Sequence, residues 1–384
     1  MKIALMTDGI YPYVIGGMQK HSYYLAKYFS KLGHKTTVFH CLNGKDTNYD
    51  QYFSKEELLN LTFVSVDFPA SGKLPGHYIR NSKRYSKALF NAFINQAQNF
   101  DFIYSKGFTG IAFYQNKSKL NCPIGVQLHG LEMFQKGGNL KQWLEKKLLK
   151  KPAKYCLTEA DVVFSYGGKI SKIVRGLGVD DKKIIKQHGA ADDFWLQNTD
   201  NQRAFDNSMA FVGRFEHRKG HHLVNQVIPN IHKDFNLIMV GNVPEDKKLK
   251  NTCIQYVGNL SAEKVFDILS KTTYLLVPSL AEGFPTIIVE AMAQGVIPIA
   301  TNVGAVAEIV NLENGFLFDS NSVSELQNTI EKALSLSLNQ RKQMSNEARK
   351  QVEENFNWDF SAKKLLSEIV VINDSWKRTN SESH

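Results

Sequence analysis

Short apolar runs of five to seven residues alternate with segments of helical periodicity along most of the chain. In the first half the apolar runs lie at residues 2–7, 35–40, 62–68, 101–105, 124–129, 161–166 and 183–188. In the second half they lie at residues 209–215, 235–241, 254–258, 273–278 and 296–301. Most of these runs are apolar throughout, without polar alternation, which is typical of strands covered on both faces of a parallel sheet.

Helical segments separate these runs. We expect helices at residues 18–32, 80–99, 140–158 and 168–176 in the first half, and at 219–231, 261–271, 284–294, 304–310, 322–335 and 339–355 in the second. This alternation predicts two doubly wound, Rossmann-like α/β domains with parallel sheets. The polar stretch 192–208 lacks periodic apolar residues. It therefore predicts a boundary between a first domain at 1–191 and a second at 192–357.

Composition fits this organisation and excludes several classes of protein. A chain of 384 residues with 43 % hydrophobic and 22 % charged residues is typical of two soluble globular domains. The four cysteines lie far apart, which excludes a disulfide framework or a zinc site and fits a reducing cytoplasm. No apolar run reaches the roughly 18–20 residues of a membrane helix. The N-terminal apolar segment is interpreted as a buried strand rather than a signal peptide, so we expect a cytoplasmic location.

The net charge of +10 is unevenly distributed along the chain. Residues 1–200 carry 28 basic and 16 acidic side chains, whereas the remainder carries 19 and 21. Such asymmetry favours an anionic partner for the first half, although solubility alone also explains it. In the segment 136–154, seven lysines surround Trp143, Leu144, Leu148 and Leu149. This pattern fits either an amphipathic helix on an anionic membrane surface or a packed surface helix. No nucleic-acid-binding motif is present, so we expect no nucleic-acid partner.

Ligands of open α/β sheets bind beyond the carboxyl ends of the strands, so candidate chemistry is sought there. Gly16 and Gly17 precede the first helix, where backbone N–H groups and the helix dipole favour an anion, although an ordinary turn also uses such glycines. Gly213, Arg214 and Lys219 follow Val212, where the predicted strand ends. The two cations there can converge on one diphosphate, with Arg218 as a competitor and a solvated basic loop as the alternative.

Two glutamates and a histidine complete the candidates. Glu282 lies in a loop after a strand, and Glu290 lies among apolar residues of the following helix. A part-buried carboxylate needs partners such as ligand hydroxyls. Attraction to a helix N-terminus would explain Glu282 but not Glu290. His129 ends the strand 124–129 and is either a site residue or an ordinary core histidine. No Asp-x-Asp, HExxH or Walker A motif is present, so we expect no metal.

Together these motifs resemble the retaining glycosyltransferases of family 4, which have the GT-B fold. The resemblance rests on GRFEHRKG (213–220) and EGFPTIIVEAMAQG (282–295), of which Glu282-x7-Glu290 is the most specific element. Five shorter motifs follow the family's order: GG-x-x-x-H (16–21), LGH (32–34), VGNLS (257–261), VGAVAEIV (303–310) and ENGFLF (313–318). The resemblance covers essentially the whole chain. It implies two domains facing a central cleft, with a final helix near 358–376 crossing back to the first domain.

The resemblance also implies roles for the candidate residues. Arg214 and Lys219 would hold the diphosphate of a nucleotide sugar, approached by Gly16 and Gly17 from the other domain. Glu290 would bind ribose hydroxyls and Glu282 hydroxyls of the donor sugar. The remaining implied contacts are His129 at the sugar, Gly283, Phe284, Pro285 and Thr286 at sugar and phosphate, and Gly258, Asn259 and Leu260 at the nucleobase. No resident cofactor is implied, because the nucleotide sugar is a co-substrate and no metal is needed.

Two segments depart from the family's pattern. His188 and Ala190 replace Asn and Val of Asn-Gly-Val-Asp, and residues 304–308 read Gly-Ala-Val-Ala-Glu instead of Gly-Gly-x-Pro-Glu. The resemblance implies transfer of a sugar, with a UDP-sugar as the expected donor, to a glycan or lipid-linked acceptor in surface polysaccharide or glycolipid synthesis. Two alternatives stay open: a nucleotide-sugar epimerase of the same fold, and a non-catalytic subunit that binds a glycan or a partner enzyme.

Overall fold

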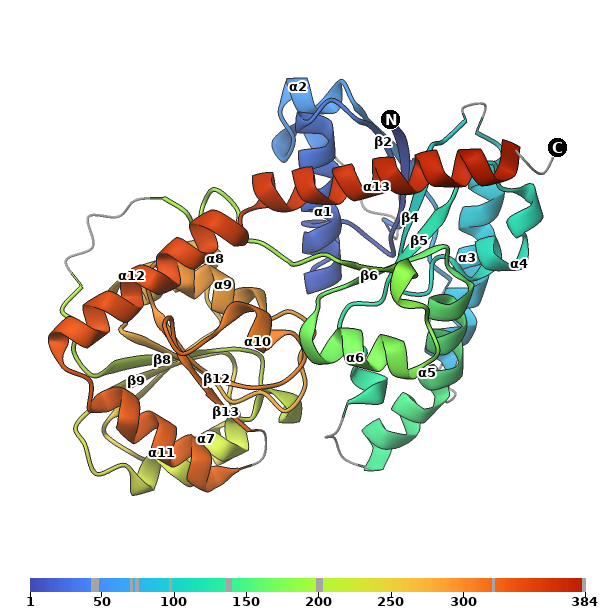
Figure 1. The fold of residues 1–384 in the computed structure, drawn as a ribbon. Coiled ribbons are helices and arrows are strands. Elements are labelled where there is room, and N and C mark those ends of the chain that lie inside the picture. Colours follow the sequence, from blue (N-terminus) through green and yellow to red (C-terminus); the bar gives the residue numbers. More distant parts are fainter. Residues whose placement is uncertain are drawn as a thin grey trace.

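The chain folds into two α/β domains that lie side by side and are joined by a long final helix (Figure 1). The structure is a computed structural model. It describes residues 1–42, 48–69, 72, 76–96, 99–135, 140–197, 203–319 and 322–381. The basic amphipathic pattern at 136–154 includes residues 136–139 and the side chain of Trp143, which lie outside the part described.

The first domain has a seven-stranded parallel sheet in the order β3-β2-β1-β4-β5-β6-β7. Its strands are β1 (Lys2–Met6), β2 (Lys35–His40), β3 (Leu61–Ser65), β4 (Phe102–Lys106), β5 (Ile124–Gln127), β6 (Val162–Ser165) and β7 (Ile184–Lys186). Its α-helices are α1 (Gly17–Lys31), α2 (Lys55–Leu58), α3 (His77–Ile94), α4 (Ile111–Gln115), α5 (Leu140–Glu159) and α6 (Gly168–Gly176). Successive β1 side chains serve opposite faces: Ile3 and Leu5 pack toward α1, and Ala4 and Met6 pack toward α3 and α4. Both faces are therefore covered, as the apolar runs predict.

The second domain has a six-stranded parallel sheet in the order β10-β9-β8-β11-β12-β13. Its strands are β8 (Ser208–Val212), β9 (Asn236–Val240), β10 (Ile254–Gly258), β11 (Tyr274–Val277), β12 (Ile297–Thr301) and β13 (Phe316–Phe318). Its α-helices are α7 (His221–Val227), α8 (Ala262–Lys271), α9 (Thr286–Ala293), α10 (Val306–Ile309), α11 (Val323–Leu334) and α12 (Leu338–Asn355). The described residues also form 3₁₀ turns η1 (Tyr49–Gln51), η2 (Lys117–Lys119), η3 (Glu132–Phe134), η4 (Asp181–Lys183), η5 (His217–Lys219), η6 (Ile228–Asn230) and η7 (Glu245–Lys247).

Two expectations for the second domain need correction. Five strands were predicted, and the structure adds a sixth, the three-residue β13 at the edge of the sheet. The single helix predicted at 219–231 is instead η5, α7 and η6 in succession. Gly220 adopts a left-handed conformation (φ 74°) that interrupts the first of these, and Pro229 opens the last. The predicted helix at 80–99 begins earlier, at His77, and ends at Ile94.

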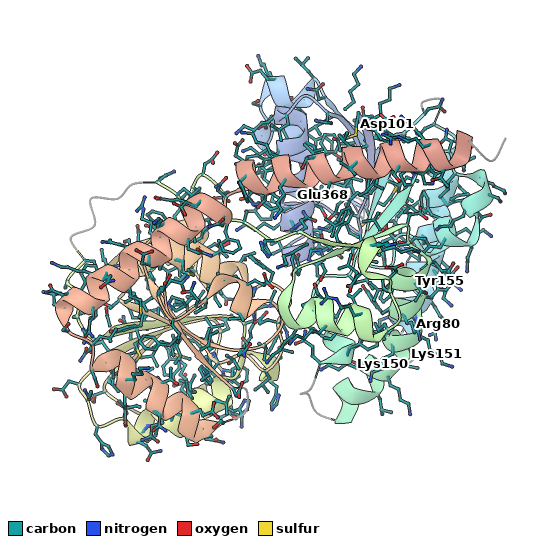
Figure 2. All side chains as sticks on the ribbon, in the orientation of Figure 1. Arg80, Asp101, Lys150, Lys151, Tyr155 and Glu368 are labelled. Atoms are coloured by element: carbon teal, nitrogen blue, oxygen red, sulfur yellow. The ribbon has the colours of Figure 1, made fainter. Side chains whose placement is uncertain are left out.

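The last helix, α13 (Trp358–Ser381), leaves the second domain and runs across the first (Figure 1). Its apolar residues join the core formed by β1 and α1: Trp358, Ala362, Leu365, Leu366 and Ile369 are all buried there. Farther along, Lys377 pairs with Asp101 before β4 at 3.3 Å, and Figure 2 shows Asp101 beside this helix. The crossing helix expected near 358–376 is therefore present.

The chain crosses between the domains twice, and the two crossings are paired. Ala191 N donates to the Phe356 carbonyl at 2.7 Å, and Ala191 forms a parallel bridge with Asn357. The first sheet ends at Lys186 and the second begins at Ser208, so the predicted boundary lies between them. The division at residue 191 itself stays a prediction.

His40, at the end of β2, gives a testable pH dependence of stability. Its ring is buried, with Nδ1 3.3 Å from the Cys41 carbonyl and Nε2 2.9 Å from the Tyr49 hydroxyl, and burial lowers its pKa to about 4. Between pH 4 and the ordinary value of about 6.5, the unfolded chain binds the extra proton, so stability falls as pH falls. We expect His40 to contribute a slope of about 1.4 kcal/mol per pH unit in this window.

Chemical unfolding at pH 7, 6 and 5 measures this slope. His40→Asn should flatten it, whereas the exposed control His232→Asn should leave it as in the wild type. Equal slopes in the wild type and His40→Asn would contradict the assignment.

Candidate active site

A cavity of about 830 Å³ lies between the two domains, at the carboxyl ends of their strands. The first domain contributes the start of α1 and the loops after β4 and β5, and the second contributes the loops after β8 and β11. This placement follows from topology, because parallel strands direct the loops that follow them to one edge of the sheet. Eleven of the predicted residues line the cavity: Gly17, His129, Gly213, Arg214, Lys219, Glu282, Gly283, Phe284, Pro285, Thr286 and Glu290.

Lys219 and Glu282 form an ion pair inside this cavity. Lys219 Nζ lies 2.6 Å from Glu282 Oε1, and their side chains are only 18 % and 7 % exposed. The loops that carry them are held together, since Leu280 N donates to the Arg218 carbonyl at 2.7 Å. A Cβ atom on Gly220 would lie 1.8 Å from the Pro278 oxygen, so only glycine fits beside that loop.

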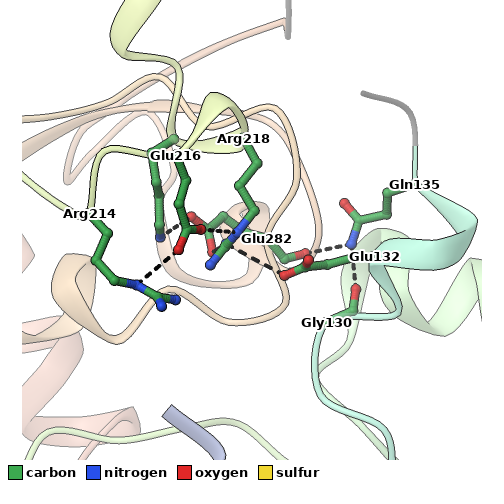
Figure 3. Close-up of polar contacts among 8 residues, drawn as sticks. Gly130, Glu132, Gln135, Arg214, Glu216, Arg218 and Glu282 are labelled. Atoms are coloured by element: carbon green, nitrogen blue, oxygen red, sulfur yellow. Dashed lines mark hydrogen bonds and ion pairs between the residues drawn. The ribbon is translucent and has the colours of Figure 1, made fainter. Parts of the chain in front are cut away.

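Arg218 joins three carboxylates of the same site (Figure 3). Its Nη1 lies 3.6 Å from Glu282 and 3.5 Å from Glu132 of the first domain, and its Nε lies 2.8 Å from Glu216. Burial alone would lower the pKa of Arg218, but the surrounding carboxylates outweigh it and raise the pKa. Arg214 is different: its side chain is 76 % exposed and pairs with Glu216 at 3.1 Å, so it lies at the rim of the cavity.

The two domains touch at the backbone beside Glu282. Gln135 Nε2 donates to the Glu282 carbonyl at 2.7 Å and to the Gly130 carbonyl at 2.5 Å, as Figure 3 shows. A Cβ atom on Gly283 would lie 2.8 Å from Gly130 Cα. Gly283 therefore permits the close approach of the loop after β11 to the loop after β5.

Glu290 is paired across the cavity with a residue that the sequence did not single out. Lys20 Nζ, from the first turn of α1, lies 2.9 Å from Glu290 Oε1. Glu290 itself is 8 % exposed, between fully buried Val289 and Ala291 of α9. Burial would lower the pKa of Lys20, but the attraction of Glu290 outweighs it and raises the pKa.

His129 belongs to a buried group of polar side chains at the first-domain wall. Its Nδ1 lies 2.6 Å from the Tyr166 hydroxyl, and its ring contacts His21 edge-on at 5.4 Å. His21 Nδ1 lies 2.6 Å from Nζ of the fully buried Lys106. Burial, reinforced by the Lys106 charge, lowers the pKa of both histidines well below 6.5, so both imidazoles are neutral at neutral pH.

Four predicted residues do not line the cavity: Gly16, Gly258, Asn259 and Leu260. Gly16 is the residue before α1, directly behind Gly17. Gly258 lies one loop away from the cavity, since Gly241 N donates to its carbonyl at 2.8 Å and Gly241 in turn packs on Gly213.

Sequence reasoning missed several residues of the cavity wall, among them Lys20, Glu132, Asp192 and Trp358. A signal for Lys20 exists in the chain. Four residues of α1 that line the cavity follow the i, i+3, i+4, i+7 spacing of one helix face: Gly17, Lys20, His21 and Tyr24. Trp358 is brought there by the crossing of α13, which local patterns do not reveal.

The two segments that depart from the family's pattern contact one another. Glu308 Oε2 lies 2.9 Å from Lys186 Nζ and 3.3 Å from His188 Nε2, and its Oε1 accepts from Gly168 N at 2.7 Å. Burial would raise the pKa of Glu308, but these partners outweigh it and lower the pKa. Glu308 of the second domain thus ties down β7 and α6 of the first.

Two Rossmann-like domains that face one cleft, with a final helix returning to the first domain, form the GT-B architecture of glycosyltransferases. The fold is similar to that of sucrose-phosphate synthase from Thermosynechococcus elongatus, with a TM-score of 0.79 at 17 % identity over 100 % of both chains. Anabaena HepE in complex with UDP and glucose also matches, with a TM-score of 0.66 at 16 % identity over 100 % of both chains.

Sequence comparison identifies the family. The model described as Glycosyltransferase Family 4 matches residues 15–188, and that described as Glycosyl transferases group 1 matches residues 197–351. The chain belongs to this family of glycosyltransferases. An uncharacterized glycosyltransferase of Methanocaldococcus jannaschii is 28 % identical over 94 % of this chain and 95 % of its own. The GPI3 subunit of phosphatidylinositol N-acetylglucosaminyltransferase from Saccharomyces cerevisiae is 25 % identical over 87 % of this chain and 75 % of its own.

Among the described residues, no helix is long and apolar enough to cross a membrane. The same part of the chain holds no group of three or more side chains that could bind a metal ion together.

Proposed function

We propose that this glycosyltransferase uses a nucleoside diphosphate sugar, with UDP-sugar as the leading candidate. The observation that carries the proposal is the pairing of Lys219 with Glu282 and of Lys20 with Glu290 in one interdomain cavity. A nucleotide sugar offers what both kinds of group need: an anionic diphosphate for the cations and hydroxyls for the carboxylates. The HepE structures, in complex with UDP or UDP-glucose, support this choice of donor.

In the proposed reaction the sugar keeps its anomeric configuration. The bond between the anomeric carbon and the phosphate oxygen breaks, and the acceptor oxygen bonds to that carbon on the same face. The acceptor's proton passes to the departing phosphate oxygen. Lys219, Arg214 and the N-terminus of α9 would stabilise the charge that develops on the diphosphate, so the reaction would need no metal ion.

The proposed acceptor is a glycan or a lipid-linked molecule at the cytoplasmic face of a membrane. Exposed lysines on α5, including Lys150 and Lys151, accompany the half-exposed Leu144 and Leu148. Figure 2 shows Arg80, Lys150 and Lys151 on the same side of the first domain. The neighbouring α5 residues Lys146 and Leu149 line the cavity, so a membrane on this face would lie next to it. The relation to the GPI3 subunit, named for transfer to phosphatidylinositol, also supports this acceptor class.

Thermal shifts with UDP, GDP, ADP and CMP and their common sugars, with and without EDTA, test the donor. A ligand at 100 times its dissociation constant adds about 2.7 kcal/mol of stability. We expect an EDTA-insensitive shift with one nucleoside diphosphate. The absence of a shift with all of them would favour the non-catalytic subunit. Conversion of the nucleotide sugar into an epimer without acceptor would favour the epimerase.

Membrane association gives a separate prediction. Reversing charge in Lys150→Glu/Lys151→Glu should weaken binding to vesicles with anionic lipid about 30-fold or more, because each lysine near such a surface contributes about 1 kcal/mol. Vesicle sedimentation at low and high salt measures it. The control Lys172→Glu/Lys182→Glu changes the same charge on exposed sites of α6 and η4. No binding by the wild type, or equal weakening in both variants, would contradict the membrane proposal.

A further inference from the structure

Two of the carboxylates that line the cavity, Glu282 and Glu290, are already paired with lysines. Glu282 is paired with Lys219 of its own domain at 2.6 Å, and Glu290 with Lys20 of the other domain at 2.9 Å. The Glu290 side chain is 11 % exposed and the Lys20 side chain 31 % exposed, so the second pair is accessible from the cavity but shielded on the Glu290 side. Without a ligand, both of these carboxylates are therefore neutralised by a cation.

A bound donor would compete with both pairs. The 2′- and 3′-hydroxyls of a ribose donate two hydrogen bonds, which a carboxylate accepts side by side, one on each oxygen. Lys20 Nζ lies 2.9 Å from Glu290 Oε1, so a ribose bound in this way competes with the ammonium for that oxygen. A diphosphate carries more negative charge than one carboxylate, so it offers the displaced cation a better partner.

Lys20 is suited to such a change of partner. It lies in the first turn of α1, three residues after Gly17, and both residues line the same cavity as Lys219 and Arg214. Lysine is a point charge on a flexible stem of four carbons, so it reaches a new anion without movement of the helix. The first domain supplies it, whereas Lys219 and Arg214 come from the second.

We propose that Lys20 is a third cation of the donor site, which neutralises Glu290 in the empty enzyme and transfers to the diphosphate when the donor binds. The inference rests on the proposed function, since it requires a nucleoside diphosphate in the cavity. Because binding exchanges one ion pair for another, the affinity depends on both the ribose and the diphosphate of the ligand. A nucleoside without phosphates must displace Lys20 without giving it a new partner, whereas a nucleoside diphosphate replaces the pair that it breaks.

This difference predicts that the affinities of Lys20→Met for UDP and for uridine change in opposite directions. In Lys20→Met the affinity for UDP should fall about tenfold, the size expected for losing one charged contact. The affinity for uridine should instead rise roughly threefold, because Glu290 no longer has to give up a partly exposed ion pair. A lysine that only held the two domains together would change both affinities in the same direction.

Isothermal titration of the 384-residue protein with UDP and with uridine measures both affinities. If the wild type prefers another base, GDP with guanosine or ADP with adenosine is used instead. The control Lys27→Met removes another lysine of α1, which does not line the cavity, and should alter neither affinity. Equal or parallel changes in Lys20→Met would overturn the inference while leaving the proposed donor intact. Failure of the wild type to bind any nucleoside diphosphate would overturn the proposed function and this inference with it.

Discussion

Turnover should fall at least 100-fold when Lys219 is replaced by alanine. The ammonium lies in the cavity against Glu282, where charge on a departing diphosphate would develop. Removing one preorganised group of this kind typically costs about 2.7–4 kcal/mol of transition-state stabilisation, which corresponds to 10²–10³ in rate. Release of nucleoside diphosphate from the donor identified by thermal shift measures the effect.

Stability must be measured alongside, because Lys219→Ala leaves Glu282 with Arg218 at 3.6 Å as its remaining ion-pair partner. A thermal unfolding curve shows whether the variant is folded at the assay temperature. Lys247→Ala, a lysine of the same domain with a 58 % exposed side chain, serves as the control and should keep its rate. A folded Lys219→Ala protein with a near-normal rate would remove Lys219 from the diphosphate site.

Replacing Glu290 with alanine should abolish measurable donor binding and leave the fold intact. We expect the dissociation constant for UDP to rise at least 30-fold, because two hydrogen bonds from ribose hydroxyls to a charged acceptor would be lost. The exposed Glu313→Ala variant is the control and should bind normally. Titration calorimetry measures the affinities, and circular dichroism checks the fold.

The 2′-deoxy form of the same nucleotide sharpens this test. The wild type should bind 2′-deoxy-UDP more weakly than UDP, whereas Glu290→Gln should discriminate less between them. If Glu290→Ala binds UDP as the wild type does, Glu290 has no contact with the nucleotide. If the variants discriminate as the wild type does, Glu290 contacts a group other than the 2′-hydroxyl.

Local patterns in the sequence predict much of the fold and less of the site. The apolar runs locate twelve strands, of which the edge strands β3, β7 and β10 are only partly buried, whereas the three-residue β13 was not predicted. Glu290 could be found because a carboxylate among apolar residues requires a partner, and Glu282 because it lies in a loop that follows a strand.

The identity of those partners could not be read locally. Lys20 is separated from Glu290 by 270 residues, and their contact depends on how two independently patterned domains are set against each other. The same holds for Glu132 beside Arg218 and for Glu308 beside His188. Each of these contacts joins the two domains, and helical or strand periodicity carries no information about such a junction.

The burial of α13 residues in the first domain constrains the order in which the protein can mature on the ribosome. Leu365 and Ile369 complete the core around β1 and α1, yet they are made after the whole second domain. At 5–20 residues per second, synthesis of residues 192–369 takes roughly 10 to 35 s. During that interval the nascent first domain exposes the apolar face that α13 later covers. The strands and covering helices of the second domain are contiguous in the chain, so this domain can fold before α13 packs on the first domain. The folded second domain then holds α13 close to the first domain until the helix packs there.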